Sequence, residues 1–251
     1  MEEWLRELYA LQGRSGRHVR VLNEAREIIA AALTHMERPY VAFSCGKDSS
    51  VLAHLVLQVD PSVPLRFLSS GETRLVHNVD LVLDYFRDLG AEIQEINIDR
   101  VFTDEWREAS WDEQRKAGKG DLEQLNAGGW DGIFMGLRAQ ESGRRKRTLW
   151  GAQTPGLPPF CYQYIAGKRL NMIRCCPLAR WITEDVGAYL LANGLPWLDW
   201  YDHHEYGFEG RTTARLTGDA VRQNALVWLK LHQPDNFNRL AERFPEFSLY
   251  V

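Results

Sequence analysis

Small, charged and hydroxyl-bearing residues interrupt an apolar run in the first quarter of the chain. Residues 41–52 read VAFSCGKDSSVL, so a strand-like segment is followed by a polar turn and then by new apolar residues. A strand that enters a helix through such a turn places free backbone N–H groups and hydroxyls at the helix N-terminus, an arrangement that binds anions. Gly46 lets the backbone come close to a phosphate, and Lys47 supplies a point charge. The sequence therefore predicts a phosphate-binding loop here.

The predicted phosphate loop comprises Ser44, Cys45, Gly46, Lys47, Asp48, Ser49 and Ser50. It differs from the P-loop G-x-x-x-x-G-K-[ST], because that motif needs a glycine at position 41 and a hydroxyl at 48, where this chain has Val41 and Asp48. Serine, glycine and aspartate are each common in ordinary turns. The unbroken set SCGKDSS, however, resembles the S-G-G-K-D-S signature of the PP-loop, or adenine nucleotide α-hydrolase-like, superfamily.

A second polar cluster follows the fourth predicted strand. Residues 136–147 read GLRAQESGRRKR and are rich in arginine and lysine. Such a run is commonly a solvated loop, but it could also clamp a polyphosphate. The order G-L-R-x-x-E-S-x-x-R resembles the G-x-R-x-x-E-S segment of the 3′-phosphoadenylyl-sulfate reductase branch of the superfamily. The candidate residues in this segment are Gly136, Arg138, Arg144 and Arg145.

A third segment points to the same branch. Residues 176–186, CPLARWITEDV, resemble the P-L-x-x-W-x-x-x-D-V/I-W segment of that branch and of the small subunit of sulfate adenylyltransferase, with Gly187 in place of the second tryptophan. Alone, this segment would be read as a capped amphipathic helix. Its position after the first two motifs extends the resemblance over roughly residues 38–200.

The resemblance implies an adenine nucleotide as ligand. In this superfamily the first motif holds the nucleotide's phosphates, and many members cleave ATP between the α and β phosphates and adenylate a substrate. The implied catalytic residues are Lys47, Asp48, Arg138 and Arg144, and Gly136 and Arg145 join the phosphate loop as binding residues. ATP would be the substrate. Mg²⁺ would bridge its phosphate oxygens, with Asp48 as the acidic candidate beside the metal.

The segment after the second predicted strand resembles the family's D-T-G-x-x-x-x-E-T region near the nucleotide. It contributes Ser70, Gly71 and Glu72 to the predicted binding site, although a serine stands where the family has aspartate. The family's iron–sulfur and thiol-dependent reductases need cysteines after the Cys175-Cys176 pair, and none follows. Neither an iron–sulfur cluster nor reduction by the chain's own thiol is therefore expected.

Three functions remain open from the sequence. The leading hypothesis is an ATP pyrophosphatase that adenylates an unidentified acceptor, in sulfur transfer or nucleic-acid modification. The second is an enzyme that binds an adenylyl sulfate and takes its thiol from a partner. The third is a non-catalytic nucleotide-binding subunit of a larger complex.

The elements that must position these residues alternate between strand and helix patterns. Short apolar stretches predict strands at residues 40–44, 65–69, 92–98 and 132–137, and helical spacing predicts helices at 19–36, 49–58, 75–89 and 183–193 and a helical tail over 216–240, with an irregular excursion over 103–129. This alternation indicates an α/β fold with a doubly wound, mostly parallel sheet, whose ligand crevice lies at the carboxyl ends of the strands. The polar clusters at 44–50, 70–72 and 136–147 each follow such a strand end.

The 251 residues suit one domain with helical additions at both ends. We expect an N-terminal helical segment (1–37), a nucleotide-binding core (38–200) and a C-terminal helical extension (201–251). The helical ends are the candidate surfaces for a protein partner or a second copy. A net charge of -4 does not favour nonspecific nucleic-acid binding, although a local basic patch leaves that partner open. The longest apolar runs fall short of a membrane span, so we expect a cytoplasmic protein.

Overall fold

Six strands form one sheet in the computed structural model, which describes residues 1–70, 78–98, 124–166, 170–203, 208, 225–243 and 245–251. The strands are β1 (Pro39–Phe43), β2 (Leu65–Ser70), β3 (Ile93–Ile98), β4 (Gly132–Phe134), β5 (Cys161–Ala166) and β6 (Leu170–Cys175). Their order in the sheet is β3-β2-β1-β4-β6-β5. All neighbouring pairs are parallel except β5 and β6, which are antiparallel. The predicted α/β fold with a mostly parallel sheet is confirmed.

The chain reverses its direction across the sheet between β1 and β4. It runs from β1 outward to β2 and β3, and then crosses to β4 on the opposite side of β1. In open parallel sheets, ligands bind at the carboxyl ends of the strands beside such a reversal. The loops that follow β1 and β4 carry the first two sequence motifs, so the topology brings these motifs together.

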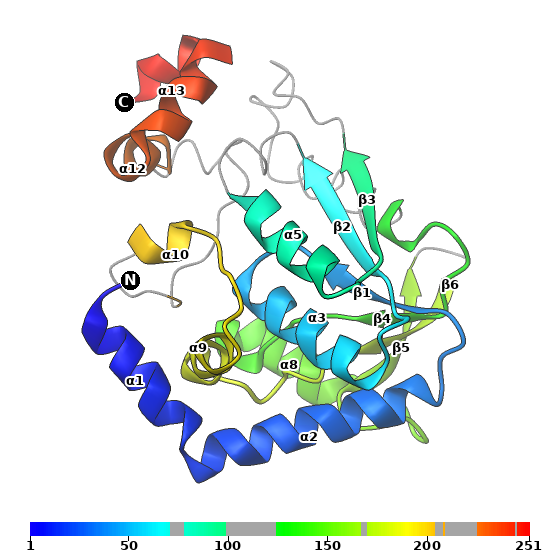
Figure 1. Cartoon of the computed structure of the whole chain (residues 1–251). Helices are drawn as coiled ribbons and strands as arrows, with labels where there is room; N and C mark the ends of the chain where they lie inside the picture. Colours follow the sequence, from blue (N-terminus) through cyan, green and yellow to red (C-terminus); the bar gives the residue numbers. More distant parts are fainter. Residues whose placement is uncertain (71–77, 99–123, 167–169, 204–207, 209–224, 244) are drawn as a thin grey trace.

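Helices lie mainly on one side of the sheet, over its large core (Figure 1). They are α1 (Glu3–Gly13), α2 (Gly16–Leu33), α3 (Lys47–Val59), α5 (Val79–Asp88), α8 (Gly143–Gly151), α9 (Thr183–Ala192), α10 (Trp200–His203), α12 (Ala225–His232) and α13 (Pro234–Arg243), with 3-10 turns η1 (Ala139–Glu141) and η3 (Pro245–Tyr250). Figure 1 shows α12 and α13 together at the end of the molecule opposite α2. The predicted helices at 19–36, 49–58 and 183–193 are confirmed within a few residues. The predicted helix at 75–89 is observed as α5 over its described part, and the helical tail predicted over 216–240 is observed from residue 225 onward as two helices, α12 and α13. Most of the excursion at 103–129 lies outside the described residues.

The sheet separates two apolar clusters because side chains of a strand alternate between its faces. On one face, Val41 and Phe43 of β1 pack with Leu65 and Phe67 of β2 in a large core that includes buried residues of α2, α3, α5 and α9. On the other face, a smaller cluster contains Tyr40, Leu125, Ile133 and Met172. Burial of each large apolar side chain contributes about 1.5–3 kcal/mol to folding, so the first cluster dominates stability.

A buried arginine anchors the segment that covers the second face. Arg66 of β2 donates from Nε to the carbonyl oxygen of Leu125 at 2.8 Å and from Nη2 to that of Ala127 at 3.2 Å. Its guanidinium also lies 4.9 Å from the ring centroid of Trp130. Burial lowers the pKa of Arg66. The guanidinium charge is nevertheless stabilised by the carbonyl oxygens that accept its hydrogen bonds and by the face of the aromatic ring. Leu125 is thereby held beside the carboxyl ends of the strands.

Helix α1, which lies in the N-terminal helical segment expected over residues 1–37, packs against α9. A side chain at Gly187 of α9 would meet the ring of Tyr9, since a Cβ there would lie 2.7 Å from the ring atoms. The Tyr9 ring therefore occupies the space of a side chain at the position where the family pattern has a second tryptophan. The departure from that pattern is compensated by an aromatic residue from α1.

Candidate functional site

Hydrogen bonds of Ser44 and Ser49 stabilise the loop between β1 and α3. Gly46 is the N-cap of α3. The Ser49 hydroxyl donates to the Gly46 carbonyl oxygen at 2.9 Å and accepts from the Ser44 N–H at 3.2 Å. The two serine hydroxyls lie 3.0 Å apart, and because Ser49 has given its one proton to Gly46, Ser44 is the donor in this pair. These bonds fix the turn that presents the first N–H groups of α3, which have no partner within the helix.

Cys45 occupies a strained position in this loop. Its φ is 57°, in the left-handed region that favours glycine, and its side chain is buried in the main core. The superfamily signature has glycine at this position, and the backbone angle explains why. The Cys45 side chain points away from the loop's outer surface, so this residue contributes only its backbone to the predicted phosphate loop. Ser50, also predicted there, is fully buried.

A cavity of about 420 Å³ opens at the carboxyl ends of β1 and β4. Its polar lining comes from the first motif, with Ser44, Gly46, Lys47, Asp48 and Ser49, and from the second, with Gly136, Glu141 and Arg145. Its apolar lining includes Leu68, Leu125, Met135 and Leu137. A pocket lined by polar, cation-bearing residues and by apolar residues suits a nucleotide, whose phosphates and base need these two environments.

Lys47 enters this cavity from the first turn of α3. Its ammonium lies 3.1 Å from Asp48 Oδ2 and 5.3 Å from the ring centroid of Tyr201, and its side chain is almost fully buried. The Tyr201 hydroxyl accepts from the Lys47 N–H at 3.4 Å. Sequence reasoning missed Tyr201, because nothing in the segment around α10 indicates that it folds back onto the first motif.

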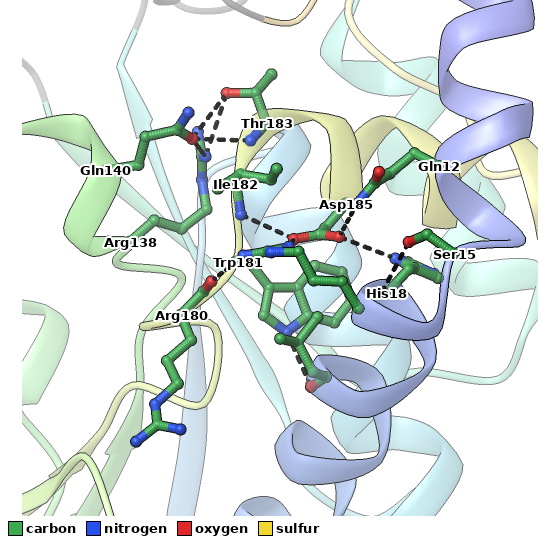
Figure 2. Close-up of polar contacts among 12 residues, drawn as sticks. Gln12, Ser15, His18, Arg138, Gln140, Arg180, Trp181, Ile182, Thr183 and Asp185 are labelled. Carbon is green, nitrogen blue, oxygen red and sulfur yellow. Dashed lines mark hydrogen bonds and ion pairs between the residues drawn. The ribbon is translucent and has the colours of Figure 1, made fainter.

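Arg138 is buried behind the cavity, although the sequence predicts it as a catalytic phosphate ligand. Its Nε lies 2.6 Å from Asp48 Oδ1. Its Nη1 donates to Gln140 Oε1 at 2.8 Å and to the Thr183 hydroxyl at 3.2 Å. Gln140 Oε1 also accepts from the Thr183 N–H at 2.8 Å, as Figure 2 shows. Arg138 thus joins all three sequence motifs and has the position of a structural link between them.

Gly136 lies against the first turn of α3. A Cβ at this position would be 3.0 Å from the carbonyl carbon and oxygen of Asp48 and 3.2 Å from the Ser49 nitrogen. These are backbone atoms of a helix start and cannot rotate away. Only glycine therefore allows the end of β4 to approach the phosphate loop this closely.

The basic run of the second motif divides into two parts. Arg145 lines the cavity and forms an ion pair with Glu141, which also accepts from the Arg138 N–H at 3.2 Å. Arg144 is exposed on α8 and does not line the cavity, so the structure does not bring this predicted catalytic residue to the others. Ser142 caps α8 by accepting from the Arg145 N–H at 3.1 Å.

The third motif positions α9 through a buried carboxylate (Figure 2). The N-cap of α9 is Ile182, and Asp185 accepts from the Ile182 N–H at 3.0 Å. Asp185 also accepts from Gln12 Nε2 at 2.7 Å and pairs with Arg17, and its Oδ1 lies 3.3 Å from His18 Nδ1. Burial raises the pKa of Asp185, but hydrogen bonds from these groups outweigh it and lower the pKa to about 2.

The acidic side chains at the cavity are paired with cations. Both oxygens of Asp48 are in ion pairs, with Lys47 and with Arg138, and Glu141 is paired with Arg145. Within the described ranges, no group of three or more His, Cys, Asp or Glu residues has the arrangement of a metal site. The role of Asp48 beside a Mg²⁺ that bridges nucleotide phosphates needs only this one carboxylate and stays a prediction. Ser70 ends β2, and the predicted residues Gly71 and Glu72 lie outside the described residues.

All four cysteines of the chain are buried. Cys161 and Cys175 are opposite each other in the β5–β6 pair. Burial raises the pKa of Cys175, and burial raises that of Cys176 to about 12. These two thiols are therefore protonated at neutral pH and are poor nucleophiles.

Comparison with known proteins relates the three motifs to one family. The family model described as the phosphoadenosine phosphosulfate reductase domain matches residues 38–240. The phosphoadenosine 5′-phosphosulfate reductase of Xanthomonas campestris pv. campestris (strain B100) is 29% identical over 196 residues, which cover 69% of this chain and 70% of that protein. Sulfate adenylyltransferase subunit 2 of Rhizobium meliloti (strain 1021) is 26% identical over 207 residues, which cover 71% of this chain and 62% of that protein. This chain thus spans less than two thirds of the second relative.

Among solved structures, similarity is limited to the general chain path. The FMN adenylyltransferase of Candida glabrata, in complex with FMN and the ATP analogue AMPCPP, gives a TM-score of 0.49 at 13% identity, over 80% of this chain and 69% of that chain. The U34-tRNA thiolase of Methanococcus maripaludis with its [4Fe-4S] cluster gives a TM-score of 0.47 at 12% identity, over 93% of this chain and 80% of that chain. These values are too low to relate individual residues. No helix in the described part of the chain is long and apolar enough to cross a membrane.

Proposed function

Because this chain belongs to the phosphoadenosine phosphosulfate reductase domain family, we propose that it binds ATP in the cavity between β1 and β4. In the proposed reaction, ATP is cleaved between its α and β phosphates and an acceptor is adenylated. The observation that carries this proposal is the meeting of the α3 N-terminus, Lys47 and Arg145 in one cavity at the carboxyl ends of the strands. One relative is named a phosphoadenosine phosphosulfate reductase and the other a sulfate adenylyltransferase subunit. Both names refer to an adenylyl group and to sulfate, which supports an adenine nucleotide as ligand and a role in sulfur metabolism.

The residues of the first motif would bind the phosphates that leave as pyrophosphate. The N–H groups at the start of α3 that have no partner within the helix, and the positive end of its dipole, favour negative charge there. Lys47 lies beside Asp48, and an incoming phosphate would compete with that carboxylate for the ammonium. Charge that develops on the bridging oxygen in the transition state is then met by groups already in place.

The proposed step needs only ATP and the acceptor as reactants. A nucleophilic atom of the acceptor attacks the α-phosphorus, the bond between this phosphorus and the bridging oxygen breaks, and pyrophosphate leaves with the bonding electrons. The acceptor's proton passes to solvent. Arg138 acts as a positioning residue, because it holds the Asp48 carboxylate from behind and does not line the cavity.

Binding of an adenylyl sulfate, with a partner's thiol as reductant, is the second candidate. The name of the Xanthomonas relative favours it. The burial of all four cysteines argues against attack by a thiol of this chain, so a reductase function would depend entirely on the external thiol. The same cavity would bind either nucleotide.

Measurement of nucleotide binding and turnover separates these candidates. Purified protein is titrated with ATP and with adenylyl sulfate by isothermal calorimetry, and release of pyrophosphate and AMP from ATP is followed. The proposal predicts pyrophosphate release by the wild type. In Lys47→Ala the rate of release should fall by about two orders of magnitude, since a lysine that neutralises a leaving phosphate stabilises the transition state by several kcal/mol. Lys230→Ala, which removes an exposed lysine on α12, is the matched control and should behave as wild type.

Each other result selects against adenylation. ATP binding without turnover in the presence of candidate acceptors would favour a non-catalytic nucleotide-binding subunit. Tighter binding of adenylyl sulfate than of ATP would favour the second candidate. Equal turnover by the Lys47→Ala and Lys230→Ala variants would show that the cavity is not the reaction site.

A further inference from the structure

Helix α8 presents a cationic surface that the nucleotide site does not use. We call this the α8 surface, and it consists of Arg144, Lys146, Arg147 and Trp150 of α8 together with Arg180. All five side chains are exposed, and Trp150 keeps 47% of its surface accessible. On a helix, Arg144, Arg147 and Trp150 recur every three residues and so lie along one side.

Three cations of this surface have no ion-pair partner in the part of the chain that the structure describes. They are Arg144, Lys146 and Arg147, whereas Arg145 pairs with Glu141 and Arg180 lies 3.2 Å from Glu24. The chain as a whole carries a net charge of -4, so this local excess of positive charge opposes the overall balance. An unpaired cationic patch on an acidic protein attracts a polyanion locally without binding nucleic acid over the whole surface.

Aromatic rings lie beside these charges. The ring of Trp150 is 5.2 Å from that of the buried Phe160, which fixes its inner side and leaves its outer side open. The guanidinium of Arg180 lies 5.4 Å from the Phe160 ring centroid on the same cluster. An exposed, supported tryptophan between arginines is suited to stack on an unpaired base, and such stacking distinguishes nucleic acid from other polyanions.

The α8 surface is continuous with the nucleotide cavity. Arg145 lines that cavity, and Ser142 and Arg145 belong to the start of the same helix whose later turns carry Arg147 and Trp150. A strand lying along α8 would therefore run up to the cavity mouth. Protein interfaces are depleted in charge at their centre, whereas nucleic-acid interfaces are strongly positive, and this difference favours a nucleic-acid occupant over an acidic protein.

We propose that the α8 surface binds single-stranded nucleic acid, with the cations on its phosphates and Trp150 stacked on a base. In the context of the proposed adenylation, on which this role rests, the bound strand would be the acceptor or would carry it. Binding itself does not require ATP cleavage. The two proposals can therefore fail separately.

Fluorescence anisotropy with labelled RNA and DNA strands of about 20 nucleotides tests the binding, since a strand of this length exceeds a typical single-strand site. Lys146→Gln/Arg147→Gln should weaken binding roughly tenfold at low salt and reduce the salt dependence, because two phosphate contacts are lost. Lys230→Gln/Arg239→Gln removes two exposed cations from α12 and α13 and is the charge-matched control, with no expected change. Lys47→Ala should bind the strands as wild type does.

An abasic strand of the same length isolates the stacking contact. Trp150→Ala should lose roughly fivefold in affinity for the normal strand and little for the abasic one, and Trp150→Phe should recover part of the loss. Circular dichroism and ATP binding report whether each variant is folded. Equal weakening by the α8 and α12–α13 double variants, or an effect of Trp150→Ala that is the same on both strands, would overturn the proposal. So would equal competition by poly-glutamate, which carries charge without bases.

Discussion

Cys45 shows how one backbone angle decides what a side chain contributes. The φ of 57° at this position strains the backbone of any residue that has a Cβ, which is destabilising. The Cys45 side chain is fully buried, and its apolar contacts are stabilising. A left-handed residue other than glycine costs about 1–2 kcal/mol. We therefore predict that Cys45→Gly is at least as stable as Cys45→Ala, although it removes more atoms from the core.

Urea unfolding of the two variants measures this order. Cys45→Ala loses the sulfur and keeps the strain, so its free energy of unfolding should fall by about 1 kcal/mol. Cys161→Ala and Cys161→Gly form the matched pair, because Cys161 is buried in β5 without a positive φ. There the usual order, with alanine more stable than glycine, is expected. Finding alanine ahead at both positions would contradict the explanation.

At the scale of elements, the contact between the end of β4 and the start of α3 positions the phosphate loop. Gly136 leaves no room for a Cβ against the Asp48 and Ser49 backbone. Gly136→Ala must push α3 away from β4, which we expect to cost about 1–3 kcal/mol of stability. ATP affinity should fall roughly tenfold as well, because the N–H groups at the helix start move. Calorimetric titration with ATP and urea unfolding check the two effects.

Gly16→Ala is the control for this variant. Gly16 is the first residue of α2, and nothing lies within 4 Å of a Cβ placed there, so alanine should be neutral or slightly stabilising. If Gly136→Ala bound ATP as tightly as Gly16→Ala does, the close approach of β4 would not matter for binding.

The strands β1 to β4 follow from short apolar or alternating stretches. β5 and β6 were not predicted, because CYQYIA and LNMIRC mix polar and apolar residues and pair directly with each other, with no helix pattern between them. The candidate site was likewise predictable only in part. The loop residues 44–49 and Gly136 follow from local pattern, whereas Tyr201 and Gln140 come from segments whose packing no local pattern encodes. The burial of Arg138 likewise depends on α9, which lies far along the chain.

Across the whole molecule, α9 joins the site to the N-terminal helices. Arg138 and Gln140 hold Thr183 at the start of α9, and two residues later Asp185 holds Gln12 and His18 (Figure 2). The N-terminal helices therefore stabilise the helix that supports Arg138, and through it Asp48. A buried polar network thus joins the N-terminal helical segment (1–37) to the core of the expected single domain.

The depressed pKa of Asp185 makes this connection sensitive to acid. Its pKa of about 2 in the folded protein is below the ordinary value, so the ionised carboxylate stabilises the fold above about pH 4, and this contribution disappears as the pH falls toward 2. The whole contribution is about 2 kcal/mol, of which about 1 kcal/mol is lost between pH 5 and pH 3. The difference in unfolding free energy between wild type and Asp185→Asn should shrink by that amount over this range.

His18→Gln should retain part of the acid sensitivity, because Arg17, Gln12 and the Ile182 N–H still bind the carboxylate. Asp84→Asn, which alters an exposed pair with Arg87, is the control for removal of a carboxylate, because an exposed ion pair contributes little to stability. Parallel pH curves for wild type and Asp185→Asn would mean that the carboxylate is not held in its ionised form, and the proposed connection from the N-terminal helices to the site would lose its electrostatic basis.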